Sequence, residues 1–375
     1  MFIMLPPGVR DFVGEKRRKL LSIIEEVFRL YGYRYMETPA LEYLSTLTEK
    51  GGEEIKEQIF YCEKEGLRFD HTVPLMRYVR DHPEIPKPFK RYAIGKVWRN
   101  EEPQKMRYRE FVQADVDIIG VKEIWASQEL LEIAEEVFRR LEIQPIIRVN
   151  HKAFLLELAK DIEDKGFFFR TLDKIDRFGK DWVKQELEKK GIDGEIVDRL
   201  SKMTLEDVRG YSEKAYEDLK VLGRTFDPFL VRGLDYYTGE LFEFGIEGVN
   251  VSVGGGGRYD GMFGSDYNVG ISFGVDRIYD IWEKEFPPKG LFIAWIKEKE
   301  FANEAASFFR RHNIPTELNL QERSLKKQLE YASKHYRWVA IIGPKEAQER
   351  KITLRDLAQS KEETLNLDEA LKKVS

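Results

Sequence analysis

The sequence predicts an α+β fold: a sheet domain, a small helical insertion and a C-terminal α/β domain. Three observations carry this prediction. Residues 92–119 alternate as two long strands around a polar turn, which is typical of a hairpin in a half-buried sheet. Residues 155–222 have helical periodicity and separate two strand-rich regions. Residues 291–342 alternate between short strands and helices.

The composition is typical of a globular chain without a membrane span. The 375 residues are 42% hydrophobic and 34% charged, which suits two or three domains, and no apolar run approaches ~18 residues. The N-terminus has neither a charged leader nor a cleavage site, so we expect a cytoplasmic protein. One cysteine and five scattered histidines offer no Cys/His zinc site, so we expect no metal ligands and a buried structural thiol at Cys62.

The N-terminal region predicts two helices around a short strand. Residues 16–31 carry apolar side chains at helical spacing and end at a glycine, and residues 34–39 form a strand that ends at a proline. A second helix is predicted over 73–79, with Thr72 as its N-cap. Asp70 lies just before that helix, where a carboxylate serves either as a capping partner or as a ligand.

The hairpin over residues 92–119 concentrates positive charge. Between Lys90 and Arg109 there are seven Lys and Arg against two Glu. Arg99, Arg107 and Arg109 occupy odd positions, so alternation predicts that they converge on one face. Guanidinium groups pair with phosphates, and the nearby Gln113, Asp115 and Asp117 offer partners for an amine. The hairpin therefore predicts a site for a polyphosphate and an amine; a solvated surface hairpin is the alternative.

Residues 230–243 follow a helix over 122–141, a strand over 145–149 and the helical block. They combine Arg232, Asp235, Tyr236 and Tyr237 with Gly233 and Gly239, which favours a small zwitterionic ligand. A structural hairpin with an Arg–Asp pair is the other interpretation of the same residues.

A run of four glycines, Gly254–Gly257, follows a strand over 249–253. It matches neither a dinucleotide fingerprint nor a P-loop, so we expect it to clear side-chain volume over a pocket floor, with Arg258 and Tyr259 at the rim. Arg277 then enters a helix that runs to about residue 284. A cation in a first turn opposes the helix dipole, so a ligand phosphate or a carboxylate is expected beside it.

The C-terminal region predicts a domain built on a parallel sheet. Strands are expected over 291–296, 315–320 and 338–342, with helices over 300–311 and 324–336 between them. Three cations open the second helix, at Arg323, Lys326 and Lys327. They suit contact with a polyanion or a solvated helix face, and the sequence does not choose between these.

Several of these stretches resemble motifs of histidyl-tRNA synthetases, a family of class II aminoacyl-tRNA synthetases, and the resemblance extends along nearly the whole chain. The motifs are Pro7-Gly8-Val9-Arg10-Asp11-Phe12, Glu37-Thr38-Pro39, Trp98-Arg99-Asn100-Glu101 with Arg107-Tyr108-Arg109-Glu110-Phe111, Arg232-Gly233-Leu234-Asp235-Tyr236-Tyr237, Gly256-Gly257-Arg258-Tyr259-Asp260 and Gly274-Val275-Asp276-Arg277.

The resemblance implies a fold, an activity and partners. The fold is an antiparallel sheet flanked by helices, with a catalytic domain over 1–154 and 223–286, a helical insertion over 155–222 and an anticodon-binding α/β domain over 291–375. The activity is the activation of L-histidine by ATP and the transfer of histidine from histidyl-adenylate to tRNA(His). The protein is expected to be a homodimer that uses Mg²⁺ with ATP.

The resemblance also implies roles for individual residues. ATP is expected to contact Arg99, Glu101, Arg107, Phe111 and Arg277. L-histidine is expected to contact Asp70, His71, Thr72, Gln113, Asp117, Arg232, Tyr236, Tyr237 and Tyr259. Arg99 and Arg232 are the expected catalytic residues, because they neutralise charge at the α-phosphate, while Mg²⁺ bridges the leaving pyrophosphate.

Two alternatives share the fold. One is a histidine-sensing relative without catalysis, such as the regulatory subunit of ATP phosphoribosyltransferase, which usually lacks the C-terminal α/β domain and the catalytic arginines. This chain has residues 291–375 and keeps Arg99, Arg232 and Arg277. The other is a synthetase paralogue that activates a different amino acid. Both alternatives differ from the main prediction in histidine-dependent ATP–pyrophosphate exchange.

Overall fold

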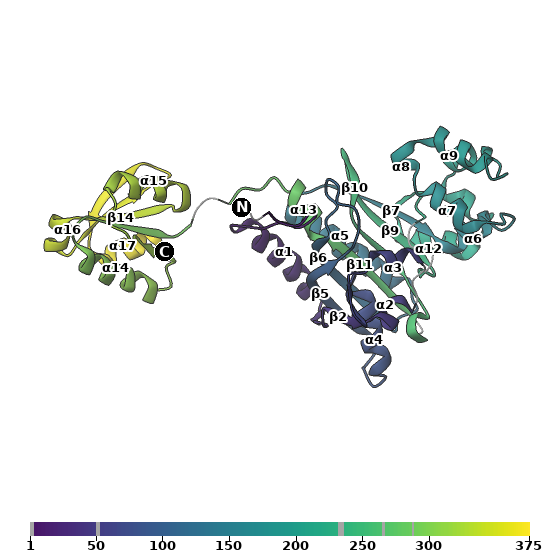
Figure 1. Cartoon of the computed structure of the whole chain (residues 1–375), viewed down its shortest axis with the longest axis horizontal. Helices are drawn as coiled ribbons and strands as arrows, with labels where there is room; N and C mark the ends of the chain where they lie inside the picture. Colours follow the sequence, from purple (N-terminus) through teal and green to yellow (C-terminus); the bar gives the residue numbers. More distant parts are fainter. Residues whose placement is uncertain (1–3, 50–52, 232–235, 265–266, 287–288) are drawn as a thin grey trace. The chain divides into compact units, whose positions relative to one another are not determined.

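The computed structural model describes residues 4–49, 53–231, 236–264, 267–286 and 289–375. The chain forms two compact units, Met1–Lys284 and Glu285–Ser375 (Figure 1). No helix within the described ranges is both long and apolar enough to cross a membrane.

An eight-stranded sheet forms the centre of the first unit. Its order is β1-β5-β6-β11-β10-β9-β7-β8, with antiparallel pairing from β5 to β7 and parallel pairing of β1 with β5 and of β7 with β8. The strands are β1 (Arg34–Tyr35), β5 (Phe89–Trp98), β6 (Glu110–Ile119), β7 (Pro145–His151), β8 (Thr225–Phe226), β9 (Glu240–Ile246), β10 (Val249–Arg258) and β11 (Asn268–Gly274).

Two long helices, α1 (Lys16–Leu30) and α5 (Trp125–Leu141), cover one face of this sheet. The ring of Phe273 on β11 lies 6.0 Å from that of Phe28 on α1 and 5.8 Å from that of Phe138 on α5. Successive strand residues point to opposite faces, so Ser272 on β11 points away from these helices. The second face of the sheet therefore stays available for a ligand.

A smaller layer precedes β5. It contains a three-stranded antiparallel sheet of order β2-β4-β3 and three helices. These elements are β2 (Leu41–Tyr43), α2 (Leu44–Thr48), α3 (Glu53–Gln58), β3 (Tyr61–Cys62), β4 (Glu65–Leu67) and α4 (Thr72–Asp81). A short 3-10 helix, η1 (Met262–Gly264), and helix α13 (Val275–Ile281) flank β11.

Seven short helices lie between β7 and β8 and gather beside the sheet, in teal in Figure 1. They are α6 (Lys152–Leu158), α7 (Lys165–Leu172), α8 (Ile175–Phe178), α9 (Lys180–Glu188), α10 (Glu195–Lys202), α11 (Leu205–Val208) and α12 (Glu213–Leu222). Their buried side chains recur at helical spacing, as Ile196, Val197 and Leu200 do on α10.

The second unit is a mixed sheet with helices on both faces. Its order is β13-β12-β14-β15-β16, in which β12 pairs in parallel with β13 and β14 while β15 and β16 are antiparallel. Ala302 and Phe309 of α14 pack on one side of the sheet and Ala332 of α15 on the other. The elements are β12 (Leu291–Trp295), α14 (Lys299–Arg311), β13 (Thr316–Leu318), α15 (Leu325–His335), β14 (Trp338–Ile342), α16 (Pro344–Glu349), β15 (Ile352–Asp356), β16 (Lys361–Leu365) and α17 (Leu367–Val374).

The predicted α+β fold with an antiparallel sheet and a C-terminal α/β domain is confirmed, as is the parallel pairing among the predicted strands β12, β13 and β14. The strands β15 and β16, which were not predicted, extend the C-terminal sheet as a hairpin. Two local predictions need correction. Cys62 is exposed rather than buried, because it lies on the two-residue strand β3 at one edge of the small sheet. Thr72 is already the first residue of α4, and the side chain that accepts a bond from the helix N-terminus is Asp70, at 3.0 Å from the Val73 N–H.

Candidate active site

A cavity of about 560 Å³ lies on the face of the eight-stranded sheet that α1 and α5 do not cover. Its walls come from regions that are distant in sequence. They include the turn before α4, the β5–β6 hairpin, the glycine run of β10, and β11 with the start of α13. Most of the motifs found in the sequence therefore meet at one place.

The glycine run forms part of the cavity wall. The backbones of Gly254, Gly255 and Gly256 line the cavity, between β9 and β11. A Cβ atom on Gly255 would lie 2.5 Å from the carbonyl oxygen of Phe242, and one on Gly256 would lie 2.0 Å from that of Gly270. Side chains are thus excluded by neighbouring backbone, and the wall stays smooth.

The sequence predicted Arg258 and Tyr259 at the rim of the pocket, but both side chains are buried instead. Arg258 is 7% exposed and its Nε donates to Glu240 at 2.9 Å, while Tyr259 is 2% exposed. The last residue of β10 and the residue after it are thus buried in the interior.

Among the residues that the structure describes, three guanidinium groups share the cavity, those of Arg99, Arg107 and Arg277. Arg99 donates to the Phe69 carbonyl at 3.2 Å, and its guanidinium carbon lies 5.2 Å from the centre of the Phe111 ring. Arg277 donates from Nε to the Met106 carbonyl at 3.0 Å and from Nη1 to the Ser252 carbonyl at 2.7 Å. Glu101 and Phe111 also line this part of the cavity.

Arg109 does not join the other arginines, although alternation predicted one shared face. Its Nη2 donates to the Asn100 side chain at 2.6 Å, and its guanidinium lies 4.7 Å from the centre of the Phe60 ring. Residues 99–109 lie outside the two strands, and Met106 has a positive φ of 61°, so strict alternation does not hold there. The prediction that Arg109 converges with Arg99 and Arg107 was wrong for this reason.

The other end of the cavity is acidic and polar. Asp70, Thr72, Gln113 and Asp115 line it. Asp115 is 3% exposed and accepts a hydrogen bond from the Ser272 hydroxyl at 2.6 Å. Burial raises the pKa of Asp115 to about 7, with the neighbouring Asp117 and Asp70 acting in the same direction and Arg91 and Ser272 opposing. Burial also raises the pKa of Asp70.

A buried network lies behind this acidic end. Arg91 is 1% exposed and forms an ion pair with Asp117 at 2.8 Å, and the Tyr259 hydroxyl donates to Asp117 at 2.5 Å. Arg91 also donates to the His71 carbonyl at 3.0 Å. Burial, together with Arg68 and Arg91, lowers the pKa of His71 to about 3, so its imidazole is neutral.

The structure therefore divides the residues expected to bind histidine into three groups. Asp70, Thr72, Gln113, Tyr236 and Tyr237 line the cavity. The side chains of His71, Asp117 and Tyr259 lie behind its wall instead, because each is buried. Arg232 lies outside the residues that the structure describes.

Two tyrosines close the acidic end. The rings of Tyr236 and Tyr237 are stacked with centroids 4.3 Å apart, and the Tyr259 ring lies 6.0 Å from Tyr236. Burial raises the pKa of Tyr236 well above its ordinary value, so its hydroxyl stays protonated.

Among the wall residues that sequence reasoning missed are Asp173 and Ser272. Asp173 comes from the turn after α7, in the helical block where no chemistry was expected, and it carried no local signal. Ser272 on β11 pairs in register with Asp115 on β6. Its alternation with Phe273 could have placed Ser272 on the ligand side of the sheet.

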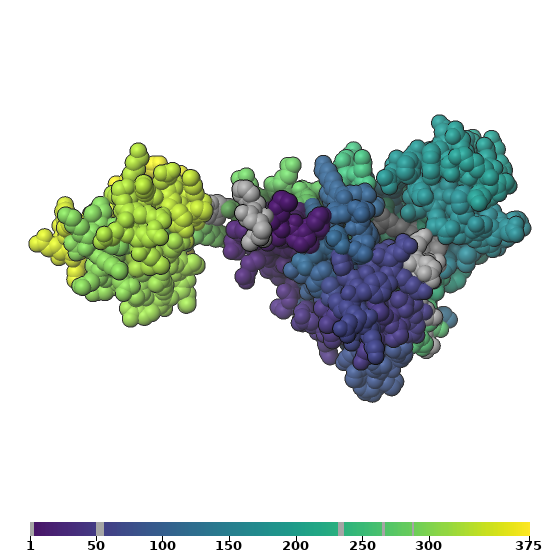
Figure 2. All heavy atoms as spheres, in the orientation of Figure 1, coloured from purple at the N-terminus to yellow at the C-terminus, as the bar shows by residue number. Residues whose placement is uncertain are grey.

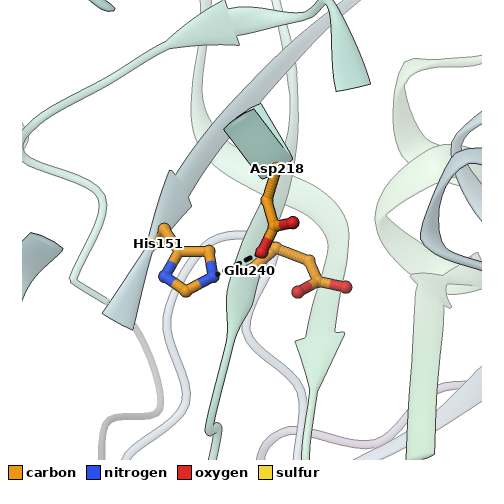
Figure 3. Close-up of side chains that lie close together, drawn as sticks. All are labelled: His151, Asp218 and Glu240. Carbon is orange, nitrogen blue, oxygen red and sulfur yellow. Dashed lines mark ion pairs between the residues drawn. The ribbon is translucent and has the colours of Figure 1, made fainter. Parts of the chain in front are cut away.

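A separate group of His151, Asp218 and Glu240 has ligand atoms within 4.8 Å of one another (Figure 3). His151 Nδ1 accepts from the Ala153 N–H at 3.0 Å, so Nε2 carries the proton in the neutral ring and faces Asp218 at 3.2 Å. A metal-binding histidine instead presents a lone pair and donates from its other nitrogen. Glu240 is already paired with Arg258 at 2.9 Å. The group therefore joins β7, β9 and α12 rather than forming a metal centre.

The arrangement suits two ligands of opposite character. Cations at one end match the phosphates of a nucleotide, and a stack of Arg99 and Phe111 offers a flat surface for a base. Carboxylates and an amide at the other end match an α-ammonium group. The chemistry that follows is the reaction of a small amino acid with a nucleoside triphosphate.

Comparisons with known proteins find relatives that cover nearly the whole chain. A family model described as histidyl-tRNA synthetase matches residues 11–224 and 199–278, and one described as anticodon binding domain matches residues 291–375. Histidine–tRNA ligases of Aeropyrum pernix and Bacteroides fragilis are 36% and 35% identical, with 98% of this chain and 97% and 98% of those proteins covered. A crystal structure of a histidyl-tRNA synthetase from Nostoc superposes with a TM-score of 0.81 at 26% identity, over 100% of this chain and 99% of that one.

Proposed function

This chain belongs to the histidyl-tRNA synthetase family, and from that premise we propose that its cavity activates L-histidine with ATP and passes it to tRNA(His). The enzyme is an ATP-dependent histidine–tRNA ligase. One observation carries the assignment of the cavity: Arg99, Arg107 and Arg277 share it with Asp70, Thr72 and Gln113.

The arginine end takes ATP in this proposal. Arg99 contacts the α-phosphate and the histidine carboxylate, and Arg277 contacts the γ-phosphate. Phe111 stacks on adenine, and Arg107 and Glu101 hold other parts of the nucleotide. Support comes from the shared cavity wall and from the backbone bonds that hold Arg277 in place, at 3.0 Å to Met106 and 2.7 Å to Ser252. The phosphate expected beside Arg277 would offset a cation in the first turn of α13.

The acidic end takes L-histidine. Asp70, Thr72 and Gln113 contact the α-ammonium group, and Tyr236 and Tyr237 enclose the side chain. Asp117 and Tyr259 act on the imidazole from behind the wall, where Arg91 compensates the Asp117 charge. His71 takes part only through its backbone, since its ring nitrogen lies 3.2 Å from the Gly95 carbonyl inside the protein.

The reaction is an in-line displacement at phosphorus. An oxygen of the histidine carboxylate attacks the α-phosphorus, a new P–O bond forms, and the bond to the leaving pyrophosphate breaks. Arg99 and Arg232 offset the negative charge that grows on the α-phosphate, so catalysis is mainly positioning and electrostatic stabilisation. A hydroxyl of the tRNA then attacks the histidyl carbonyl, and AMP leaves.

Magnesium fits the site as an ion that arrives with ATP. Mg²⁺ prefers oxygen ligands and usually binds one or two carboxylates together with substrate phosphates. Glu101 offers such a carboxylate in the cavity wall. When bound, the ion supplies positive charge beside the leaving pyrophosphate.

ATP–pyrophosphate exchange, measured separately in the presence of each of the twenty amino acids, tests the assignment. We expect exchange with histidine alone. Histidine binding without exchange would instead identify a histidine sensor, and exchange with another amino acid would identify a paralogue. Asp161→Asn is a suitable control, because this exposed carboxylate lies on the surface of the insertion and should leave the rate unchanged.

The finer organisation of the chain belongs to the same proposal. Residues 1–154 and 223–286 form the catalytic domain, 155–222 the insertion, and 291–375 the domain that binds the anticodon of tRNA(His). The proposal includes the cytoplasm as the compartment of the enzyme.

We also propose a homodimer, with exposed apolar side chains around β1 and the small sheet at its interface. Tyr35, Leu41, Tyr43 and Tyr61 are 52%, 50%, 64% and 56% exposed. A concentration of exposed aromatic surface is typical of a subunit interface. Sedimentation equilibrium tests this, and a monomer at all concentrations would contradict it.

A further inference from the structure

The N-terminal segment contacts both sides of the proposed ATP site. This clamp, defined as residues 8–12, has no part in the roles assigned above. Figure 2 shows the N-terminal residues, in purple, against the blue atoms of the β5–β6 hairpin. The Gly8 carbonyl accepts from the Arg109 N–H at 2.8 Å and from the Glu110 N–H at 3.4 Å, where the chain enters β6. The clamp therefore begins on the hairpin that carries Arg99 and Arg107.

Close contact at Gly8 requires a glycine. Its φ is +79°, which L side chains rarely adopt, and a Cβ atom there would lie 2.7 Å from Cγ of Arg109. The segment is thus seated directly on the hairpin.

Arg10 connects this hairpin to α13. Its Nη1 donates to an Asp280 carboxylate oxygen at 2.6 Å, and its Nη2 donates to the Asp276 carbonyl at 3.1 Å. Its guanidinium also lies 4.0 Å from the centre of the Tyr108 ring, and the Tyr108 hydroxyl donates to the other Asp280 oxygen at 2.5 Å. Arg10, Tyr108 and Asp280 thus form a closed triangle of contacts.

A second set of bonds converges on Asp276. One carboxylate oxygen accepts from the Val112 N–H at 2.6 Å, on β6, and Arg17 of α1 donates to both oxygens at 2.8 Å and 3.1 Å. Phe12 also contacts Arg17, because the Arg17 guanidinium lies 3.4 Å from the centre of the Phe12 ring. Charge-assisted and bidentate bonds of this kind impose a defined geometry.

These contacts lie directly beside two residues of the proposed ATP site. Arg107 precedes Tyr108, and Arg277 follows Asp276. Arg277 itself donates to the Met106 carbonyl, in the same loop as Arg107. Any displacement of the loop from α13 changes the separation of the two guanidinium groups.

We propose that Arg10 is a positioning residue that holds the loop before β6 against α13 and so sets the spacing of Arg107 and Arg277 for ATP. This inference rests on the proposed function for the identity of the ligand. Arg10 itself does not line the cavity. Its loss should therefore act on ATP and leave the histidine end unaffected.

Arg10→Gln tests the proposal by steady-state ATP–pyrophosphate exchange. We expect the KM for ATP to rise about tenfold and the KM for histidine to change less than about twofold, as for the loss of bonds at one end of the cavity. Arg18→Gln is the matched control, because Arg18 is a neighbouring exposed arginine on α1. Tyr108→Phe removes only the hydroxyl bond to Asp280 and should shift the KM for ATP in the same direction by a smaller factor.

A second readout does not depend on activity. Trypsin should cleave after Lys105 or Arg107 faster in Arg10→Gln than in the unmodified protein or in Arg18→Gln, and ATP should protect all three. Equal increases in the KM for ATP and the KM for histidine would overturn the proposal. Unchanged KM values together with an unchanged rate of trypsin cleavage would also overturn it. If the unmodified enzyme shows no histidine-dependent exchange, the proposed function is wrong. The trypsin comparison still tests whether Arg10 holds the loop before β6 against α13.

Discussion

Replacement of Asp115 by asparagine should change how the stability of the ligand-free protein depends on pH. Asp115 is 3% exposed, lines the cavity and accepts a hydrogen bond from Ser272 at 2.6 Å. Arg91 is the nearby cation, but it forms its ion pair with Asp117, and Asp70 adds further negative charge. An asparagine side chain keeps the size and an acceptor for Ser272 but carries no charge.

The sign follows from the raised pKa. The carboxyl titrates near 7 in the folded protein and near 3.8 ordinarily. Between these values the folded state binds more protons than the unfolded state, so the stability contributed by protonated Asp115 is lost as the pH rises towards 8. The whole shift of about three pKa units corresponds to roughly 4 kcal/mol. Roughly 2 to 3 kcal/mol of this falls between pH 5 and pH 8.

Thermal unfolding of the unmodified protein and of Asp115→Asn across that pH range measures the effect. The Tm of the variant minus the Tm of the unmodified protein should increase by roughly 5–10 °C from pH 5 to pH 8, at ~2–4 °C per kcal/mol. Saturating histidine should reduce the difference, because its ammonium group stabilises the charged carboxylate. Asp161→Asn, which alters an exposed carboxylate, is the control. Parallel pH curves for the unmodified protein and Asp115→Asn would refute the assignment of a raised pKa to this buried group.

Two further predictions concern catalysis and tRNA. Arg232→Ala should abolish adenylate formation in single-turnover assays, while calorimetry finds histidine binding largely intact, because the proposed role of this arginine is in the transition state; an unchanged exchange rate would contradict that role. Deletion of residues 291–375, which lie within a separate compact unit, should reduce tRNA charging far more than pyrophosphate exchange. Equal reductions would mean that this unit serves the stability of the first.

Local patterns in the sequence predicted most secondary structure. Helical spacing of apolar residues marked α1 and α5, and alternation marked β5, β6 and the first strands of the C-terminal unit. These patterns arise because one side of each element is buried. The ends of elements were less certain: α5 begins at Trp125 rather than at 122, because the stripe of buried residues does not define the first turn.

The same patterns predicted much of the cavity wall. Arg99, Gln113, Tyr236 and the glycine run stood out because charged groups, phenols and glycines are rarely combined for packing alone. The motifs that contain Arg99, Tyr236 and part of the glycine run also carried the resemblance to a family, whereas the position of Asp70 alone left a capping partner and a ligand open. Functional residues that lie close together in the sequence could therefore be predicted without the structure.

Long-range placement was decided only by the tertiary structure. Arg109 turns away from Arg107 because the loop before β6 does not alternate. Asp173 reaches the cavity because the insertion packs beside the sheet. Arg10 meets Asp280 across 270 residues of chain. The physical reason is the same in each case. The spacing of apolar residues in the sequence determines which side of a helix or strand is buried. Which other element packs against that side depends on how segments distant in the sequence come together in the fold.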